Sequence, residues 1–147
     1  MKKSIIIWIS IGVLLILTIR AFNLHGDDLR SERQSYIKQL GYNFSGEIDS
    51  LQIHNGSHGL VYFHVTRGDV STTREKEISK KLTHHAELIL LEFRRSDLIG
   101  IASETADQYV KGDSIVVSTD DNLVTVFRKG NKITESEVLP WLRGRQF

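Results

Sequence analysis

The chain has 147 residues, nineteen Lys and Arg against eighteen Asp and Glu, a formal net charge of +1, and no cysteine. The missing cysteine excludes disulfides and a lipid anchor on cysteine, and the balanced charge gives no field to gather nucleic acid. One proline and eleven glycines are too few for a disordered or low-complexity chain, so we expect an ordered domain.

An apolar segment opens the chain. Two lysines precede an uncharged run over residues 4–19, and Arg20 closes it. At ~1.5 Å per residue such a helix nearly crosses a ~30 Å hydrocarbon core. We therefore predict that residues 1–24 are a signal anchor, a transmembrane helix with membrane lipid as the partner of residues 4–24. A cleaved signal peptide is the alternative interpretation, but the segment has a poor cleavage site.

Basic residues on both sides of this segment favour opposite orientations. A long trailing domain, however, is translocated largely regardless of its charge. The predicted localisation is therefore a single-pass membrane protein whose soluble domain lies on the periplasmic or extracellular side.

A helical pattern follows over residues 27–40, and Gly41 stands where helices commonly end. This helix is either a stalk or the first helix of the fold. The predicted division of the chain is a transmembrane helix at 1–24, a helical stalk at 25–42 and a soluble α+β domain at 43–147.

The clearest strand pair covers residues 50–54 and 61–65, where apolar and polar side chains alternate. An Asn-Gly turn signal links the two strands. Pairing His54 with Leu60 brings the large apolar residues onto one face, which a one-residue slip would prevent. The sequence thus predicts an antiparallel hairpin.

The middle of the chain predicts a helix from about residue 73 to 83. A strand at 87–93 and a short strand at 98–102 are expected to follow. The run of apolar residues at 88–91 is also consistent with a continued helix, so the two interpretations compete here.

The C-terminal part predicts a meander of strands at 114–118, 123–128 and 132–134. The pattern Thr134-Glu135-Ser136-Glu137 has the form of a capping box and predicts a brief helix. Residues 141–142 are expected to fold back onto the domain. The predicted fold class is α+β, an N-terminal transmembrane helix followed by a small, mostly antiparallel, partly barrel-like β domain with one or two helices.

Three segments carry a resemblance to a known group. Residues 44–48, residues 109–115 with their Gly112-Asp113-Ser114-Ile115 block, and residues 126–130 resemble uncharacterised small bacterial membrane-anchored β-domain proteins with a GDSI-type hairpin. The resemblance covers residues 44–130. It implies a compact, partly barrel-like sheet and no known activity.

The Gly112-Asp113-Ser114-Ile115 block also resembles the nucleophile block of the SGNH hydrolases, which need an Asp-x-x-His further along the chain. No histidine follows His85, so the base that would activate a serine is missing. We therefore predict no catalytic residue and interpret the block as a turn that begins a strand.

Histidines in the predicted hairpin are the candidate metal ligands. His54, His58 and His64 would have to converge at one end of the hairpin, because zinc needs three or four ligands at ~2.0–2.1 Å. Solvated histidines on a polar face are the alternative, and we expect no cofactor.

These features favour a non-catalytic, membrane-anchored protein of the cell envelope that presents a binding or assembly domain outside the cytoplasm. An envelope protein is its expected partner, and nucleic acid is not. The alternative is a small envelope enzyme, a metal-dependent or hydrolytic module that uses the histidine-bearing hairpin.

Overall fold

The computed structural model describes residues 2–82, 88–95 and 97–142, and the chain forms two compact units, Met1–Arg33 and Gln34–Phe147. The described helices are α1 (Lys2–Leu40), α2 (Thr72–Ser79) and the 3-10 helix η1 (Ala106–Gln108). The described strands are β1 (Asn43–Asn55), β2 (His58–Arg67), β3 (Leu88–Ile89), β4 (Glu92–Phe93), β5 (Leu98–Ser103), β6 (Ser114–Ser118), β7 (Leu123–Arg128), β8 (Asn131–Glu137) and β9 (Trp141–Leu142).

Helix α1 corrects the prediction of a membrane anchor. Among the described residues, no helix is long and apolar enough to cross a membrane. The predicted transmembrane helix and signal anchor at 1–24 is therefore wrong, and so is the single-pass membrane localisation.

The C-terminal end of α1 belongs to the second unit. Tyr36, Ile37 and Leu40 are buried there in the hydrophobic core, and their spacing places them on one side of the helix. The helix ends at Leu40, and Gly41 follows with φ +58°, the left-handed conformation that favours glycine. The helix therefore ends where its sequence predicts.

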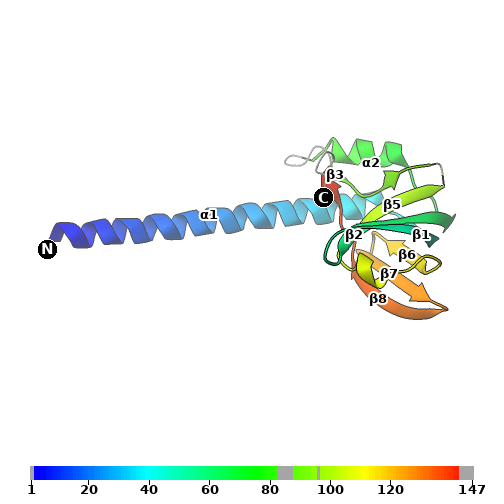
Figure 1. The fold of residues 1–147 in the computed structure, drawn as a ribbon. Helices are drawn as coiled ribbons and strands as arrows, with labels where there is room; N and C mark the ends of the chain where they lie inside the picture. The colour runs from blue at the N-terminus through cyan, green and yellow to red at the C-terminus, as the bar shows by residue number, and fades with distance from the viewer. Residues whose placement is uncertain (1, 83–87, 96, 143–147) are drawn as a thin grey trace. The chain divides into compact units, whose positions relative to one another are not determined.

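One antiparallel sheet organises the second unit, with the strand order β4-β5-β2-β1-β6-β7-β8 (Figure 1). Strand β1 is thirteen residues long and pairs with β2 on one side and β6 on the other. An isolated bridge joins Ala102 of β5 to Leu139, just after β8. The fold is thus a mostly antiparallel seven-stranded sheet with three helices among the described residues. This finding replaces the predicted fold class, a transmembrane helix with a partly barrel-like domain and one or two helices.

The β1–β2 hairpin has a register two residues away from the prediction. Gln52, instead of His54, lies opposite Leu60. The reason is a tighter turn, because only two residues separate the strands and Gly56 supplies a φ of +59°. A shift of two residues keeps each side chain on its predicted face of the sheet.

Two segments differ from their predicted structure. Helix α2 ends at Ser79, and the strand predicted at 87–93 is divided into β3, which pairs with β9, and β4, which pairs with β5. Residues 83–87 lie outside the described part. The helix predicted from Thr134 is instead the second half of β8, because hydrogen bonding to β7 competes with the local capping signal. Residues 141–142 do fold back, as β9.

The core lies on one face of the sheet and has an aromatic centre. The Phe44 ring stacks on Phe63 with centroids 5.8 Å apart, and Tyr42 meets the Phe44 ring edge-on at 6.2 Å. Alternate residues of β2, β5, β6 and β7 complete this face, among them Val61, Ile99, Ile101, Ile115, Val117, Val124 and Val126. The period of two leaves the intervening side chains on the opposite, outer face.

A few polar groups are buried where α1, α2 and the segment after β3 meet within the second unit. Glu75 of α2 is buried, and its Oε2 accepts a hydrogen bond from the Leu91 backbone N–H at 3.4 Å. Burial raises the pKa of Tyr36, and the nearby Glu75 carboxylate raises it further. Burial also raises the pKa of Tyr42 to about 12. The Tyr42 hydroxyl bonds to the backbone of Ser71, the N-cap of α2.

Candidate functional site

The outer face of β1, β2 and β5 carries a connected polar arrangement of side chains from several strands. Val61 and Phe63 of β2 face the core, so Tyr62 between them faces outward. Tyr62 lies opposite Gly100 of β5. A Cβ atom on Gly100 would come within 2.7 Å of the Tyr62 ring, so the ring lies directly against this glycine. Glycine at this position is what permits the ring's close approach.

Arg94 stacks over the tyrosine ring. Its guanidinium carbon lies 3.7 Å from the ring centroid, a close cation–π contact. Its Nη2 donates to the Tyr62 hydroxyl at 2.7 Å and to Gln52 Oε1 at 3.3 Å. The turn after β4 holds the arginine backbone, because the Arg94 N–H donates to the Leu98 carbonyl at 3.0 Å. The Arg94 side chain nevertheless stays 48% exposed.

Glu92 completes this arrangement of residues from β1, β2, β4 and the turn after β4. Its Oε2 accepts a hydrogen bond from the Tyr62 hydroxyl at 3.2 Å, and its Oε1 lies 3.7 Å from Arg94 Nε. Burial raises the pKa of Tyr62, the Glu92 carboxylate adds to that rise, and the phenol stays protonated at neutral pH. We call Gln52, Tyr62, Glu92 and Arg94 the Tyr62–Arg94 cluster.

The chemistry of the Tyr62–Arg94 cluster suits recognition. A guanidinium stacked on a fixed ring and bonded on one edge is held in a single orientation while its remaining surface faces solvent. Nη1 of Arg94 makes no hydrogen bond to a described residue. It can therefore donate to an outside group without breaking an existing bond. The cluster pairs one cation with one carboxylate, so it carries no net charge.

A second polar row lies beside this cluster on the same face. His64 Nδ1 lies 3.0 Å from Asp97 Oδ2. Across the strands, Glu47 of β1 lies opposite His64, and Ser114 of β6 lies opposite Glu47. Ser114 and His64 are thus two strands apart, roughly 10 Å, which is too far for a serine and its base to share a hydrogen bond. Ser114 and His64 therefore do not form a pair of nucleophile and general base.

The three histidines proposed as metal ligands are not brought together. His54 is exposed near the end of β1, and His58 is exposed at the start of β2. His64 lies six residues further along β2, roughly 20 Å away for an extended strand. Among the residues that the structure describes, no group of three or more His, Cys, Asp and Glu side chains could hold a metal ion.

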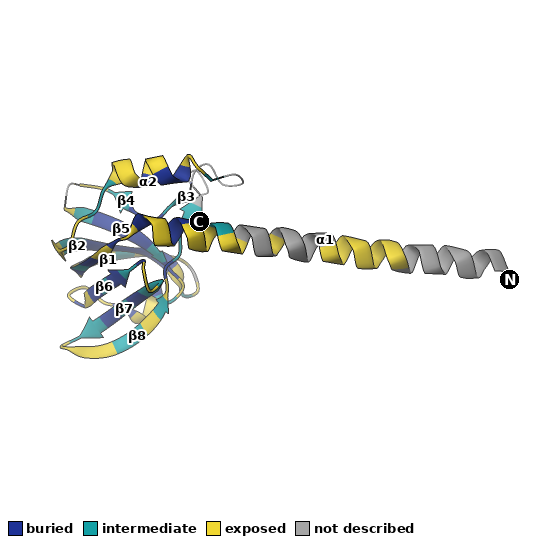
Figure 2. Cartoon of the chain, turned by 180° about the vertical axis from the view of Figure 1, so that it is seen from behind, coloured by how far each residue is buried: buried dark blue, intermediate teal, exposed yellow. Residues whose placement is uncertain are grey.

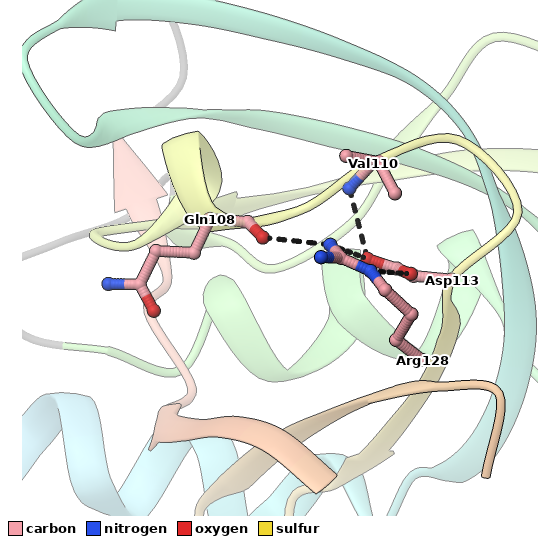
Figure 3. Close-up of polar contacts among 4 residues, drawn as sticks. All are labelled: Gln108, Val110, Asp113 and Arg128. Carbon is pink, nitrogen blue, oxygen red and sulfur yellow. Dashed lines mark hydrogen bonds and ion pairs between the residues drawn. The ribbon is translucent and has the colours of Figure 1, made fainter. Parts of the chain in front are cut away.

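The Gly112-Asp113-Ser114-Ile115 block forms a different site, drawn in Figure 3. The Asp113 carboxylate is buried and receives two hydrogen bonds from Arg128, Nε to Oδ1 at 2.9 Å and Nη2 to Oδ2 at 2.8 Å. The Val110 backbone N–H adds a third at 3.0 Å. The hydrogen bonds from Arg128 lower the pKa of Asp113, and the carboxylate raises the pKa of Arg128 in return.

Backbone hydrogen bonds tie this turn to β1. The Gly112 N–H donates to the Ile48 carbonyl at 2.8 Å, and the Ile48 N–H donates to the Asp113 carbonyl at 2.9 Å. Gly112 has φ +90°, a backbone conformation that glycine adopts far more readily than other residues, which explains why a glycine stands at this position. Lys111 pairs with Asp49 at 3.0 Å on the surface. The block is therefore a turn that starts β6, and its aspartate holds the end of β7 through Arg128.

Sequence reasoning missed the Tyr62–Arg94 cluster entirely. Its members come from residues 52 to 94, and the β1–β2, β2–β5 and β4–β5 pairings together bring them into one place, of which the sequence predicts only the first. The one local signal is Gly100, a glycine within an apolar strand, which indicates close approach of another group.

Comparison with known proteins adds no assignment to this geometry. No protein-family model, no curated protein and no solved structure matches the chain.

Proposed function

We propose that residues 34–147 form a non-catalytic binding domain that contacts a protein partner through the outer face of the sheet, centred on the Tyr62–Arg94 cluster. The single observation that carries this proposal is the half-exposed Arg94 guanidinium, held 3.7 Å above the Tyr62 ring. Tyrosine and arginine are among the residues that most often dominate the energy of protein interfaces.

The way the cluster is held supports binding further. A side chain already fixed in one conformation loses little entropy when a partner orders it, so more of its contact energy appears as affinity. Arg94 is fixed by the ring beneath it, by Gln52 and by the Tyr62 hydroxyl. Because Glu92 balances its charge, the cluster suits the mixed polar surface of a folded protein more than a polyanion.

Site-specific photocrosslinking tests the proposal. A benzophenone side chain at Ser50, which lies opposite Tyr62, is expected to give a discrete protein adduct in cells that naturally make the chain. The same side chain at exposed Asn131, on the edge strand β8, should not give that adduct. Equal adducts from both positions would mean that the outer face has no special role.

A matched pair of arginine variants sharpens the test. Arg94→Ala should reduce the Ser50 adduct by about tenfold, a typical loss for an interface arginine. Arg95→Ala should leave it unchanged, because Arg95 is also exposed but its side chain makes no hydrogen bond or ion pair with a described residue. Circular dichroism spectra that match the native chain should verify that both variants fold. An unchanged adduct in Arg94→Ala contradicts the proposal.

A further inference from the structure

Helix α2 presents a basic surface separate from the outer sheet face. The helix turns Glu75, Ile78 and Ser79 into the domain. Lys76 on the helix and Lys80, the C-cap residue after Ser79, are both exposed. They are four residues apart, and Lys80 keeps a helical backbone conformation, so they are neighbours on one face. Lys81 is exposed just after the helix. Figure 2 shows α2 exposed along most of its length, with a buried portion at its inner side. We call Lys76, Lys80 and Lys81 the α2 lysines.

The charges of the α2 lysines are not neutralised within the described part of the chain. None of the three forms an ion pair with a described residue. By contrast, Lys111 and Lys132 lie 3.0 and 3.1 Å from carboxylate oxygens. The α2 lysines are therefore free to attract an outside anion.

The rest of the second unit is acidic. Residues 34–147 hold fourteen of the nineteen Lys and Arg residues and fifteen of the eighteen Asp and Glu, a formal charge of −1. The three α2 lysines together with Glu77 contribute a formal charge of +2, so the other residues of the second unit carry a formal charge of −3. Helix α2 itself carries two basic and two acidic residues, so the excess positive charge lies at its C-terminal end and just after it, in residues 76–81.

We propose that the α2 lysines bind a short acidic segment of a partner protein. A run of a few Asp or Glu residues is small enough to contact the helix alone. A nucleic acid would extend beyond it onto the acidic remainder and be repelled there. The interaction is electrostatic and exposed, so it weakens as salt is added.

Fluorescence anisotropy of the full chain with a labelled eight-residue Glu-Asp peptide tests this proposal at low salt. The double variant Lys76→Glu/Lys80→Glu should bind the peptide about tenfold more weakly, since it replaces two attractive pairs by repulsive ones. Lys38→Glu/Lys129→Glu is the matched control, because both lysines are exposed, form no ion pair with a described residue and change the net charge equally.

Three results would overturn the proposal. The first is no binding of the peptide at low salt, and the second is an equal loss in both double variants, which would indicate only the overall field. The third is tighter binding of a single-stranded oligonucleotide of the same charge, which would assign the surface to nucleic acid. Lys76→Gln/Lys80→Gln should fall between the native chain and the charge reversal, and native unfolding midpoints exclude misfolding as the cause.

Discussion

Arg128 supplies two of the three hydrogen bonds that hold the buried Asp113 carboxylate. Arg128→Met keeps most of the apolar stem but leaves that carboxylate without its main partner, and an unpaired buried charge is costly. We expect the free energy of unfolding in urea to fall by about 2 kcal/mol near pH 7. Lys132→Met is the control, because its ion pair with Glu135 is exposed and worth less than about 1 kcal/mol. Equal losses would contradict the assigned role of Arg128.

The same carboxylate predicts a dependence on acid. Hydrogen bonds from Arg128 lower the pKa of Asp113 below the unfolded value of roughly 3.9. A lowered folded pKa adds stability above the unfolded pKa, and this stability is lost as pH falls through the folded pKa. The native chain should therefore exceed Asp113→Asn in unfolding free energy at pH 6, and the difference should shrink below about pH 4. A difference that stays constant from pH 6 to pH 3 would show that Asp113 does not titrate this way.

Among the elements, β5, β6 and β7 lie where the sequence predicts them, because each has an apolar alternation bounded by turn residues. The prediction fails where a distant strand decides the structure. Strands β3 and β4 are only two residues long and depend on β9 and β5. The same holds for the candidate site. Arg94 follows β4, so nothing in its local sequence places it over Tyr62.

The β2–β5 pair predicts an effect of one added methyl group. In Gly100→Ala the new Cβ would lie 2.7 Å from the Tyr62 ring, so the ring must move and Arg94 with it. We expect a loss of about 1–3 kcal/mol in stability. The ring-current shift of the Arg94 side-chain protons should also disappear from the NMR spectrum.

Gly112→Ala is the control for that change. Its Cβ would meet nothing within 4 Å, and only its φ of +90° opposes the substitution. Gly112→Ala should lower the free energy of unfolding by about 1 kcal/mol through backbone strain. It should leave the chemical shifts of the Arg94 side-chain protons unchanged. If both variants shift those protons equally, the packing of Tyr62 on Gly100 is not what positions Arg94.

At the scale of the whole molecule, the boundary at residues 33 and 34 makes a prediction about truncation. A chain of residues 34–147 retains Tyr36, Ile37 and Leu40, which are at most 3% exposed. A chain beginning at residue 43 loses all three, at about 2 kcal/mol or more each. That sum approaches the total stability of a small domain. Thermal melting should show a cooperative transition for 34–147 and little or none for 43–147. Equal melting temperatures would place these residues outside the core.

Alkaline unfolding tests the core as a whole. Tyr36, Tyr42 and Tyr62 are three of the four tyrosines, and burial is the largest cause of the raised pKa of each. A raised folded pKa adds stability that is fully present below the unfolded value of roughly 10 and is lost as pH rises through the folded pKa. Unfolding free energy should therefore decline from about pH 10 upward.

Tyr36→Phe isolates one of these groups, because it keeps the buried ring and removes only the titrating hydroxyl. The decline in unfolding free energy between pH 9.5 and pH 11.5 should be less steep in this variant, whatever its stability at pH 7. Urea titrations followed by tryptophan fluorescence measure both slopes. Parallel slopes would mean that the Tyr36 hydroxyl ionises as easily in the folded chain as in the unfolded one, which its complete burial beside Glu75 argues against.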